Sequence, residues 1–116
     1  MSGITIDGSL ATHATSPAGM AATENDYAGA TGSFARLTPN AAGSVVTGFA
    51  GGVDGRVLTI VNLGNANLTL LHEDGGSAAG NRLLTKGGAS VVMPADGIVS
   101  FLYDATTQRW RQSTTL

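Results

Sequence analysis

The stretch that most constrains the fold of this chain is residues 55–73, GRVLTIVNLGNANLTLLHE. β-Branched and aliphatic residues alternate along 57–61 and again along 68–72. Between these runs, the sequence NLGNAN supplies glycine and asparagine, which tolerate the backbone conformations of tight turns. Two alternating runs on either side of such a turn are typical of a β-hairpin. We therefore expect 55–73 to form a central hairpin of two antiparallel strands.

The sequence from residue 31 onwards has the same character throughout. No segment has the apolar period of a helix longer than one turn. The further strands that we expect lie between turn-forming Gly, Asn, Asp and Pro residues, at 33–39, 44–50, 89–95, 97–104 and 109–114. Short strands separated by regular turn signals predict an all-β fold, which we expect to be a single antiparallel β-sandwich of the jelly-roll type.

The first thirty residues differ, because their apolar side chains are scattered among Ala, Gly, Ser and Thr without a period. One interpretation is a frayed terminus, which is common in any domain. The other is an extended arm that becomes ordered against a neighbouring subunit. The apolar anchors of such an arm would be Ile4, Ile6, Leu10, Met20 and Tyr27. The sequence thus predicts an N-terminal arm over 1–30 and a β-sandwich domain over 31–116.

Composition limits the classes of partner. The chain has 116 residues, of which 42% are hydrophobic and only 12% charged, so it can build a core and does not have the composition of a disordered chain. A surface so poor in charge is either covered by a partner or rich in small uncharged residues. The net charge of −2 gives no broad reason to expect nucleic-acid binding.

Targeting signals are also missing from the sequence. No apolar run approaches the roughly 20 residues of a membrane-spanning helix. The first fifteen residues have neither the basic region nor the apolar region of a secretory signal. Cysteine is absent, so disulfide and thiol chemistry are excluded. We expect a protein that is made in a cytoplasm and does not bind a membrane.

Motifs that carry chemistry are lacking as well. His13 and His72 lie far apart and in no metal-ligand spacing, and His72 with its acidic neighbours is most simply the polar end of a strand. The sequence contains no G-x-S-x-G nucleophile elbow and no phosphate-binding glycine motif. No Asp or Glu lies within an apolar stretch that would shift its pKa. We therefore expect no enzyme activity, no catalytic residue, no metal site and no cofactor.

Trp110 is the single tryptophan, and it lies between Arg109 and Arg111. In a strand, alternation places the indole on one face and both guanidinium groups on the other. One interpretation is an aromatic and cationic patch for glycan or nucleic acid. The interpretation that we favour is a core tryptophan with solvated arginines, because a lone large aromatic residue in a small domain usually supplies core area.

Five short motifs, taken in order, resemble a module that recurs in virion proteins of tailed bacteriophages. The resemblance covers residues 55–111 and extends to capsid cement or decoration proteins, and to the tips of tail fibres and baseplate receptor-binding proteins. The motifs are GRVLTIVN at 55–62, LTL at 68–70, NR at 81–82, YD at 103–104 and RW at 109–110. The resemblance implies a β-sandwich and carries no active site.

Each of these motifs also has a structural interpretation in physical terms. Asn62 can cap or turn the end of a strand. Arg82 can bridge to Asp104 or to backbone carbonyls through its planar guanidinium. Tyr103 and Trp110 can pack together across a short terminal hairpin.

The position of the module behind a short arm resembles a cement protein more than the end of a fibre shaft. The resemblance then implies a non-enzymatic protein that binds the outer surface of the assembled capsid and clamps neighbouring subunits. It implies the major capsid protein as partner, a homo-oligomer (dimer or trimer), no nucleic-acid or membrane partner, and synthesis in the host bacterial cytoplasm.

Two alternatives remain open. The first is a tail-fibre or baseplate receptor-binding module that recognises host surface glycan, and the second is a lectin-like carbohydrate-binding module. An exposed Trp110 and a dispensable arm would favour glycan recognition, whereas a buried Trp110 and an arm needed for shell binding would favour the capsid role.

Overall fold

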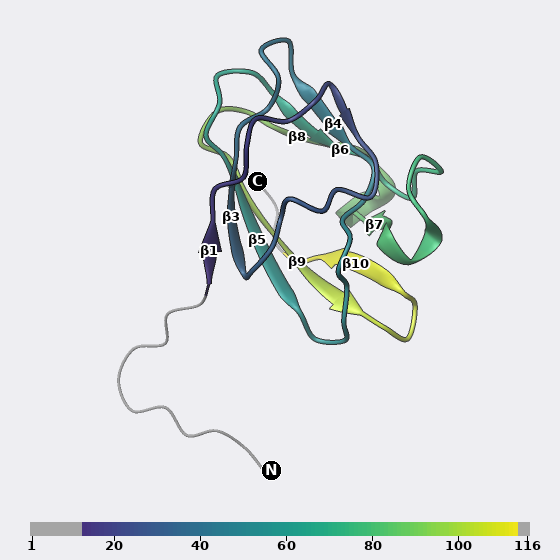
Figure 1. The fold of residues 1–116 in the computed structure, drawn as a ribbon. Coiled ribbons are helices and arrows are strands. Elements are labelled where there is room, and N and C mark those ends of the chain that lie inside the picture. The colour runs from purple at the N-terminus through teal and green to yellow at the C-terminus, as the bar shows by residue number, and fades with distance from the viewer. Residues whose placement is uncertain (1–12, 114–116) are drawn as a thin grey trace.

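The structure is a computed structural model that describes residues 13–113. Their strands form two sheets, and helix is confined in these residues to two 3₁₀ turns, η1 (Ala79–Asn81) and η2 (Lys86–Gly88). Sheet A has the strand order β1-β3-β5-β9-β10-β7 and sheet B the order β2-β4-β6-β8 (Figure 1). The strands of sheet A are β1 (Ala14–Thr15), β3 (Phe34–Leu37), β5 (Val57–Asn62), β9 (Ile98–Asp104), β10 (Arg109–Gln112) and β7 (Leu83–Leu84). Those of sheet B are β2 (Thr23–Glu24), β4 (Ser44–Val46), β6 (Leu68–Leu70) and β8 (Val91–Met93). The predicted all-β fold is confirmed.

The chain winds between the two sheets as a short solenoid. From β1 to β6 each strand lies in the other sheet from the one before it. As a result, β1, β3 and β5 are parallel neighbours in sheet A, and β2, β4 and β6 are parallel neighbours in sheet B. After β6 the direction reverses, so that β8 lies antiparallel to β6 and β9 lies antiparallel to β5.

The prediction of an antiparallel jelly roll was therefore wrong in its strand pairing. Parallel neighbours need a crossover between them, and here the crossover of each sheet is a strand of the other sheet. Alternation of side chains is the same in parallel and antiparallel strands, so the sequence pattern did not distinguish the two.

The prediction of a central hairpin over 55–73 was also wrong, because β5 and β6 lie in different sheets. The turn between them is a corner that the buried amide of Asn62 holds. Its Nδ2 donates to the carbonyl oxygens of Ala66 at 2.8 Å and Met93 at 3.0 Å, and its Oδ1 accepts from the Gly64 N–H at 2.9 Å. A Cβ at Gly64 would lie 2.7 Å from Pro39 Cδ, so the close packing of this corner requires glycine.

Residues 13–30, predicted as part of an extended arm, belong to the folded body. β1 and β2 are the outermost strands of sheets A and B. The predicted partner contacts Met20 and Tyr27 are instead buried in the protein's own core, with 5% and 8% of their surface exposed. Two-residue strands are too short to show alternation in the sequence, which is why this segment looked irregular. The other predicted contacts, Ile4, Ile6 and Leu10, lie outside the described residues.

The core lies between the two sheets and centres on aromatic rings. Phe49 packs edge-on against Phe101, Trp110 and Tyr27, with ring centroids 5.9, 6.0 and 6.4 Å apart. Offset and edge-on rings are favourable arrangements that add to the burial of apolar area. The inward side chains of β5 and β9 complete this core, namely Leu58, Ile60, Val99, Phe101 and Tyr103.

The corner at Asn62 gives the first prediction. Asn62→Ala should lower the free energy of unfolding by about 2 kcal/mol or more, because it removes three side-chain hydrogen bonds of the corner, one of them buried. The measurement is urea unfolding followed by circular dichroism. Asn65→Ala is the control, because Asn65 is exposed in the same turn and should change stability by less than about 0.5 kcal/mol. Equal unfolding midpoints for the two variants would contradict the role of Asn62.

Candidate functional site

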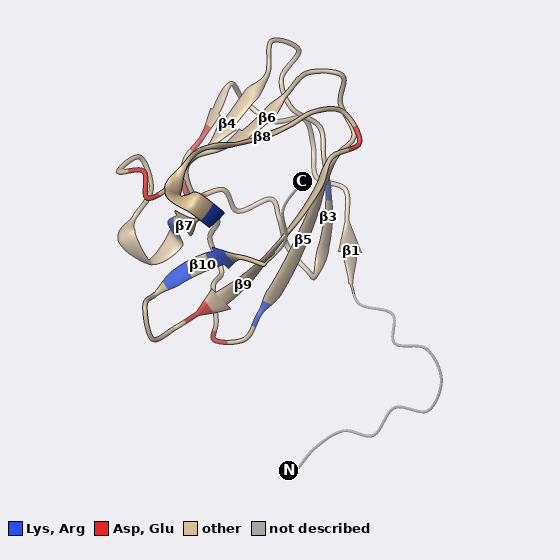
Figure 2. Cartoon of the chain, turned by 180° about the vertical axis from the view of Figure 1, so that it is seen from behind, with Lys and Arg blue, Asp and Glu red and all other residues tan. Residues whose placement is uncertain are grey.

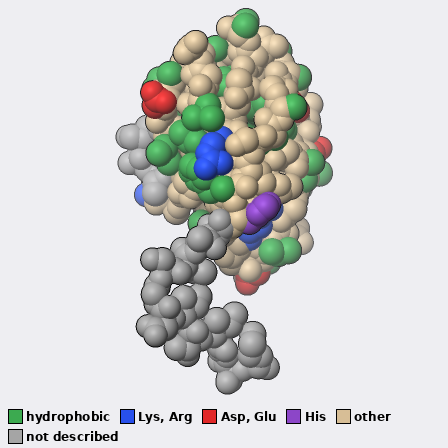
Figure 3. Space-filling view, turned by 60° about the vertical axis from the view of Figure 1, so that its left-hand side comes forward, with side chains coloured by type: hydrophobic (Ala, Val, Ile, Leu, Met, Phe, Trp, Pro, Cys, Tyr) green, Lys and Arg blue, Asp and Glu red, His purple; other side chains and the backbone are tan. Residues whose placement is uncertain are grey.

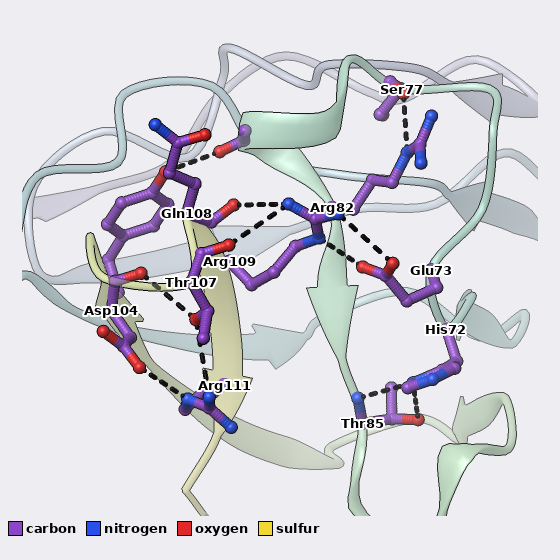
Figure 4. A network of polar contacts seen from close by, with 12 residues as sticks. His72, Glu73, Ser77, Arg82, Thr85, Asp104, Thr107, Gln108, Arg109 and Arg111 are labelled. Carbon is purple, nitrogen blue, oxygen red and sulfur yellow. Dashed lines mark hydrogen bonds and ion pairs between the residues drawn. The ribbon is translucent and has the colours of Figure 1, made fainter.

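Residues 13–113 enclose no pocket, and they bring no three His, Asp or Glu side chains together in a group that would hold a metal ion. Nor do these residues form a helix long and apolar enough to cross a membrane. The imidazole of His72 lies against Thr85, with Nδ1 accepting from the Thr85 N–H at 3.1 Å (Figure 4). A functional site in this part of the chain would therefore lie on its surface.

The polar network beside β10 joins neighbouring elements of the fold (Figure 4). Arg109 forms an ion pair with Glu73, and Arg111 Nε donates to Asp104 Oδ2 at 2.8 Å. The Arg109 guanidinium lowers the pKa of the Glu73 carboxyl, and that of Arg111 lowers the pKa of Asp104. Arg82 donates through Nε to the Ser77 carbonyl at 3.0 Å, while Asp104 pairs with Arg111. These charges satisfy one another, which favours a structural role.

Trp110 lies at the centre of the core, and none of its surface is exposed. Its indole N–H donates to the Phe49 carbonyl at 2.9 Å. Tyr103, its partner across the β9–β10 pair, packs edge-on against it at 5.1 Å and donates its hydroxyl to the Gly80 carbonyl. The indole is thus enclosed and has no face free for a sugar ring.

Arg56 closes the core beside Trp110. Its guanidinium lies 5.3 Å from the centre of the indole ring. Nη2 donates to the carbonyl oxygens of Ala30 at 2.8 Å and Gly32 at 2.9 Å, and Nη1 donates to that of Gly51 at 2.9 Å. Partial burial lowers the pKa of Arg56. Arg56 thus links the loops at residues 30–32 and at Gly51 to the start of β5, so its role is structural.

The outer face of sheet A is the surface feature that the fold does not explain. We define it by the outward side chains of its central strands and of the neighbouring β3. These are Phe34, Arg36, Val57, Thr59, Val61, Ile98, Ser100 and Leu102. Its middle is a ladder of three cross-strand pairs, Val57 with Leu102, Thr59 with Ser100 and Val61 with Ile98.

Large apolar side chains are exposed on this face. Val57, Ile98 and Leu102 have 48%, 53% and 41% of their surface exposed. The outward side of a solvated sheet normally carries polar residues. Charged residues flank the β5–β9 pair at both ends (Figure 2): Arg56 precedes β5 and Asp104 ends β9 at one end, and Asp96 lies beside Asn62 at the other. The face thus carries three exposed apolar side chains around a polar pair, Thr59 and Ser100, whose hydroxyl oxygens lie 2.7 Å apart, and it is a candidate interaction surface.

Arg36 is the cation beside this ladder, next to Val61 in the sheet register. Its guanidinium lies 5.2 Å from the centre of the Phe34 ring and donates a 3.4 Å hydrogen bond to Ser16 Oγ. Among the described residues it forms no ion pair, in contrast to Arg109 and Arg111. Figure 3, which brings forward the side with β1 and β3, shows hydrophobic side chains around a Lys or Arg side chain.

A sequence signal for this face existed and was missed. Apart from Thr59 and Ser100, the runs VLTIV at 57–61 and IVSFLY at 98–103 are apolar at outward as well as inward positions. Such nearly continuous apolar runs are typical of strands that are covered on both sides. We had used them only as evidence for strands.

No protein-family model matches the sequence, and no curated protein is significantly similar to it. The features that bear on function are therefore the buried Trp110, the internally paired polar network and the outer face of sheet A.

The enclosed position of Trp110 gives the second prediction. Because it is the single tryptophan, the intrinsic fluorescence of the protein reports on this site alone. The folded protein should emit at the short wavelengths of a buried indole and resist quenching by acrylamide, and guanidinium unfolding should remove both properties. Red-shifted, easily quenched emission from the folded protein would contradict the burial of Trp110.

The Glu73–Arg109 pair gives the third prediction. Since Arg109 lowers the folded-state pKa of Glu73 below its ordinary value of 4.5, the pair stabilises the fold above that pH. This contribution is lost as the pH falls through the lowered pKa. Glu73→Gln should therefore cost at most about 1 kcal/mol near neutral pH and progressively less in acid. Urea unfolding at several pH values measures it.

Arg109→Gln is the control for that prediction, because it removes the same pair from the other side. It should reproduce the pH dependence of Glu73→Gln. A difference from the wild type that stays constant down to acid pH would show that the pair does not stabilise the fold.

Proposed function

We propose that this chain is a non-enzymatic structural protein of a tailed-bacteriophage virion, a cement protein on the outer surface of the capsid. It clamps neighbouring subunits of the major capsid protein. The observation that carries this proposal is the outer face of sheet A, where Val57, Ile98 and Leu102 are exposed and where the described residues form no pocket. The resemblance of residues 55–111 to phage virion modules supplies the kind of partner.

The rigidity of the body supports such a role. A clamp must hold its shape while it bridges subunits, and here two sheets enclose a core of packed aromatic rings. Within the described residues, every buried side-chain polar atom has a hydrogen-bond partner. A body without buried unsatisfied groups adopts one arrangement rather than several.

The burial of Trp110 weighs against glycan recognition as the function. A sugar-binding platform needs an accessible aromatic face beside polar groups. Trp110 is completely buried, and Arg109 and Arg111 are paired with carboxylates. The receptor-binding alternative thus loses the residues that were its candidates.

The mechanism needs only binding. A protein that binds the assembled shell but not its open or unassembled form stabilises the assembled form by mass action, by about 2.7 kcal/mol per site at a hundredfold excess over Kd. A dimer or trimer of the chain, placed on a symmetry axis of the shell, would repeat the same contacts around that axis. The working location is the outer capsid surface, after synthesis in the host cytoplasm.

The fourth prediction is that the protein co-sediments with empty mature capsids of the phage that encodes it. Binding should saturate at a fixed number of copies per shell, and decorated shells should open at a higher temperature than bare ones. Host cells, tested in parallel, should not retain the protein. Retention by cells but not by capsids would place the protein in the tail instead.

A truncated protein that begins at residue 13 can test the contribution of the N-terminal segment separately. Deleting residues 1–30 would remove β1 and β2 and the buried Met20 and Tyr27, so it would damage the fold itself. Deleting residues 1–12 leaves all described strands in place and asks only whether this segment contributes to shell binding.

A further inference from the structure

The imidazole of His72 joins two segments of the fold as a hydrogen-bond acceptor. His72 follows β6 of sheet B, and its Nδ1 accepts from the backbone N–H of Thr85, directly after β7 of sheet A, at 3.1 Å (Figure 4). The hydrogen on a backbone nitrogen cannot rotate away, so Nδ1 has to present its lone pair to it. The neutral imidazole therefore carries its proton on Nε2, and the bond to Thr85 needs the ring uncharged.

The segment that follows Thr85 is held by hydrogen bonds rather than by apolar packing. Residues 86–90 are all exposed, and they carry the chain from β7 in sheet A to β8 in sheet B. The Thr85 hydroxyl donates to the Ala89 carbonyl at 2.6 Å, and the Lys86 N–H donates to Gln112 Oε1 at 2.9 Å. Exposed segments with few apolar contacts open at a low free-energy cost. The bond from Thr85 to His72 fixes the start of this segment.

Several charged groups lie on the segments around His72, whereas β7 and β8 consist of apolar residues. The carboxylates are already engaged, Glu73 by Arg109 and Asp74 by the Gly76 N–H, and the cations can only donate. None of these groups offers the Thr85 N–H an acceptor in place of His72. They are Glu73, Asp74, Arg82, Lys86, Arg109 and Arg111.

We propose that His72 and Thr85 form a pH-sensitive latch, which holds residues 85–90 at neutral pH and releases them in mild acid. Protonation of the imidazole places a hydrogen on Nδ1, opposite the Thr85 N–H, and so removes the acceptor. The Thr85 hydroxyl, 3.2 Å from Nδ1, can accept the new hydrogen, but the backbone N–H of this buried residue is left without a partner. The latch goes beyond the proposed function, because it acts within the chain whatever the chain binds.

Amide hydrogen exchange of the full chain, followed by nuclear magnetic resonance at about pH 7.5 and about pH 5, tests the latch. The protection factor corrects for the intrinsic effect of pH on exchange. For the Thr85 N–H it should fall about fivefold or more at the lower pH, while the amides of β5 keep theirs. The Glu73–Arg109 pair stays intact at both values, because Arg109 lowers the pKa of Glu73 below 4.5.

Two variants, each checked for folding by circular dichroism and its urea midpoint, assign the effect. His72→Asn keeps an acceptor, since Oδ1 of asparagine occupies the place of Nδ1, but that oxygen does not take up a proton in this range. The Thr85 protection factor of this variant should agree at the two pH values to within about twofold. His13→Asn is the control, because His13 is the other histidine of the chain and is exposed. It should keep the fall of the wild type.

The nitrogen chemical shifts of the imidazole give a second measurement on the wild type, and at neutral pH they should show the proton of His72 on Nε2. A proton on Nδ1, an unchanged Thr85 protection factor in the wild type, or the same fall in His72→Asn would overturn the latch. If His72→Asn does not fold, the two wild-type measurements decide. Since none of them involves a capsid, failure of the latch leaves the proposed function standing.

Discussion

The buried amide of Asn62 decides where the chain leaves sheet A, and the rest of the arrangement depends on that corner. The side chain binds backbone groups of the corner and of β8, while the Asn62 backbone pairs with Gly97 and Asp96 at the start of β9. The side chain of Asn62 thus connects the end of β5 in sheet A to β8 in sheet B. If it were apolar, the corner would lose three hydrogen bonds, including the buried one to the Met93 carbonyl. β5, which ends at this corner, and its neighbour β9 are the two central strands of sheet A.

The sequence predicted the all-β class and the approximate positions of the longer strands, because alternation and turn residues are local signals. It failed where local signals are shared by different folds. The run 55–73 has the pattern of a hairpin, yet the hydrogen bonds of Asn62 send its second half into the other sheet. The segment 13–30 looked like an arm, since its strands have two residues each and its packing relies on glycine. A Cβ at Gly29 would lie within 2.5 Å of the Tyr27 ring.

The prediction of functional residues from the sequence failed for a different reason. The residues chosen from short motifs, Arg82, Tyr103, Asp104 and Trp110, all make contacts inside the chain. The outer face of sheet A was present in the sequence as two runs that are apolar on both sides except at Thr59 and Ser100, but which charges are paired could not be known before the positions of the carboxylates were. Which charges are paired is a property of the fold, and it identifies Arg109 and Arg111 as structural arginines.

Electron cryomicroscopy of decorated capsids tests the proposed function most directly. The proposed function predicts density for the chain at junctions between capsid subunits, with the exposed side chains of β5 and β9 in sheet A toward the shell. Density that contacts the shell through sheet B, with the Val57–Leu102 pair facing solvent, would contradict it.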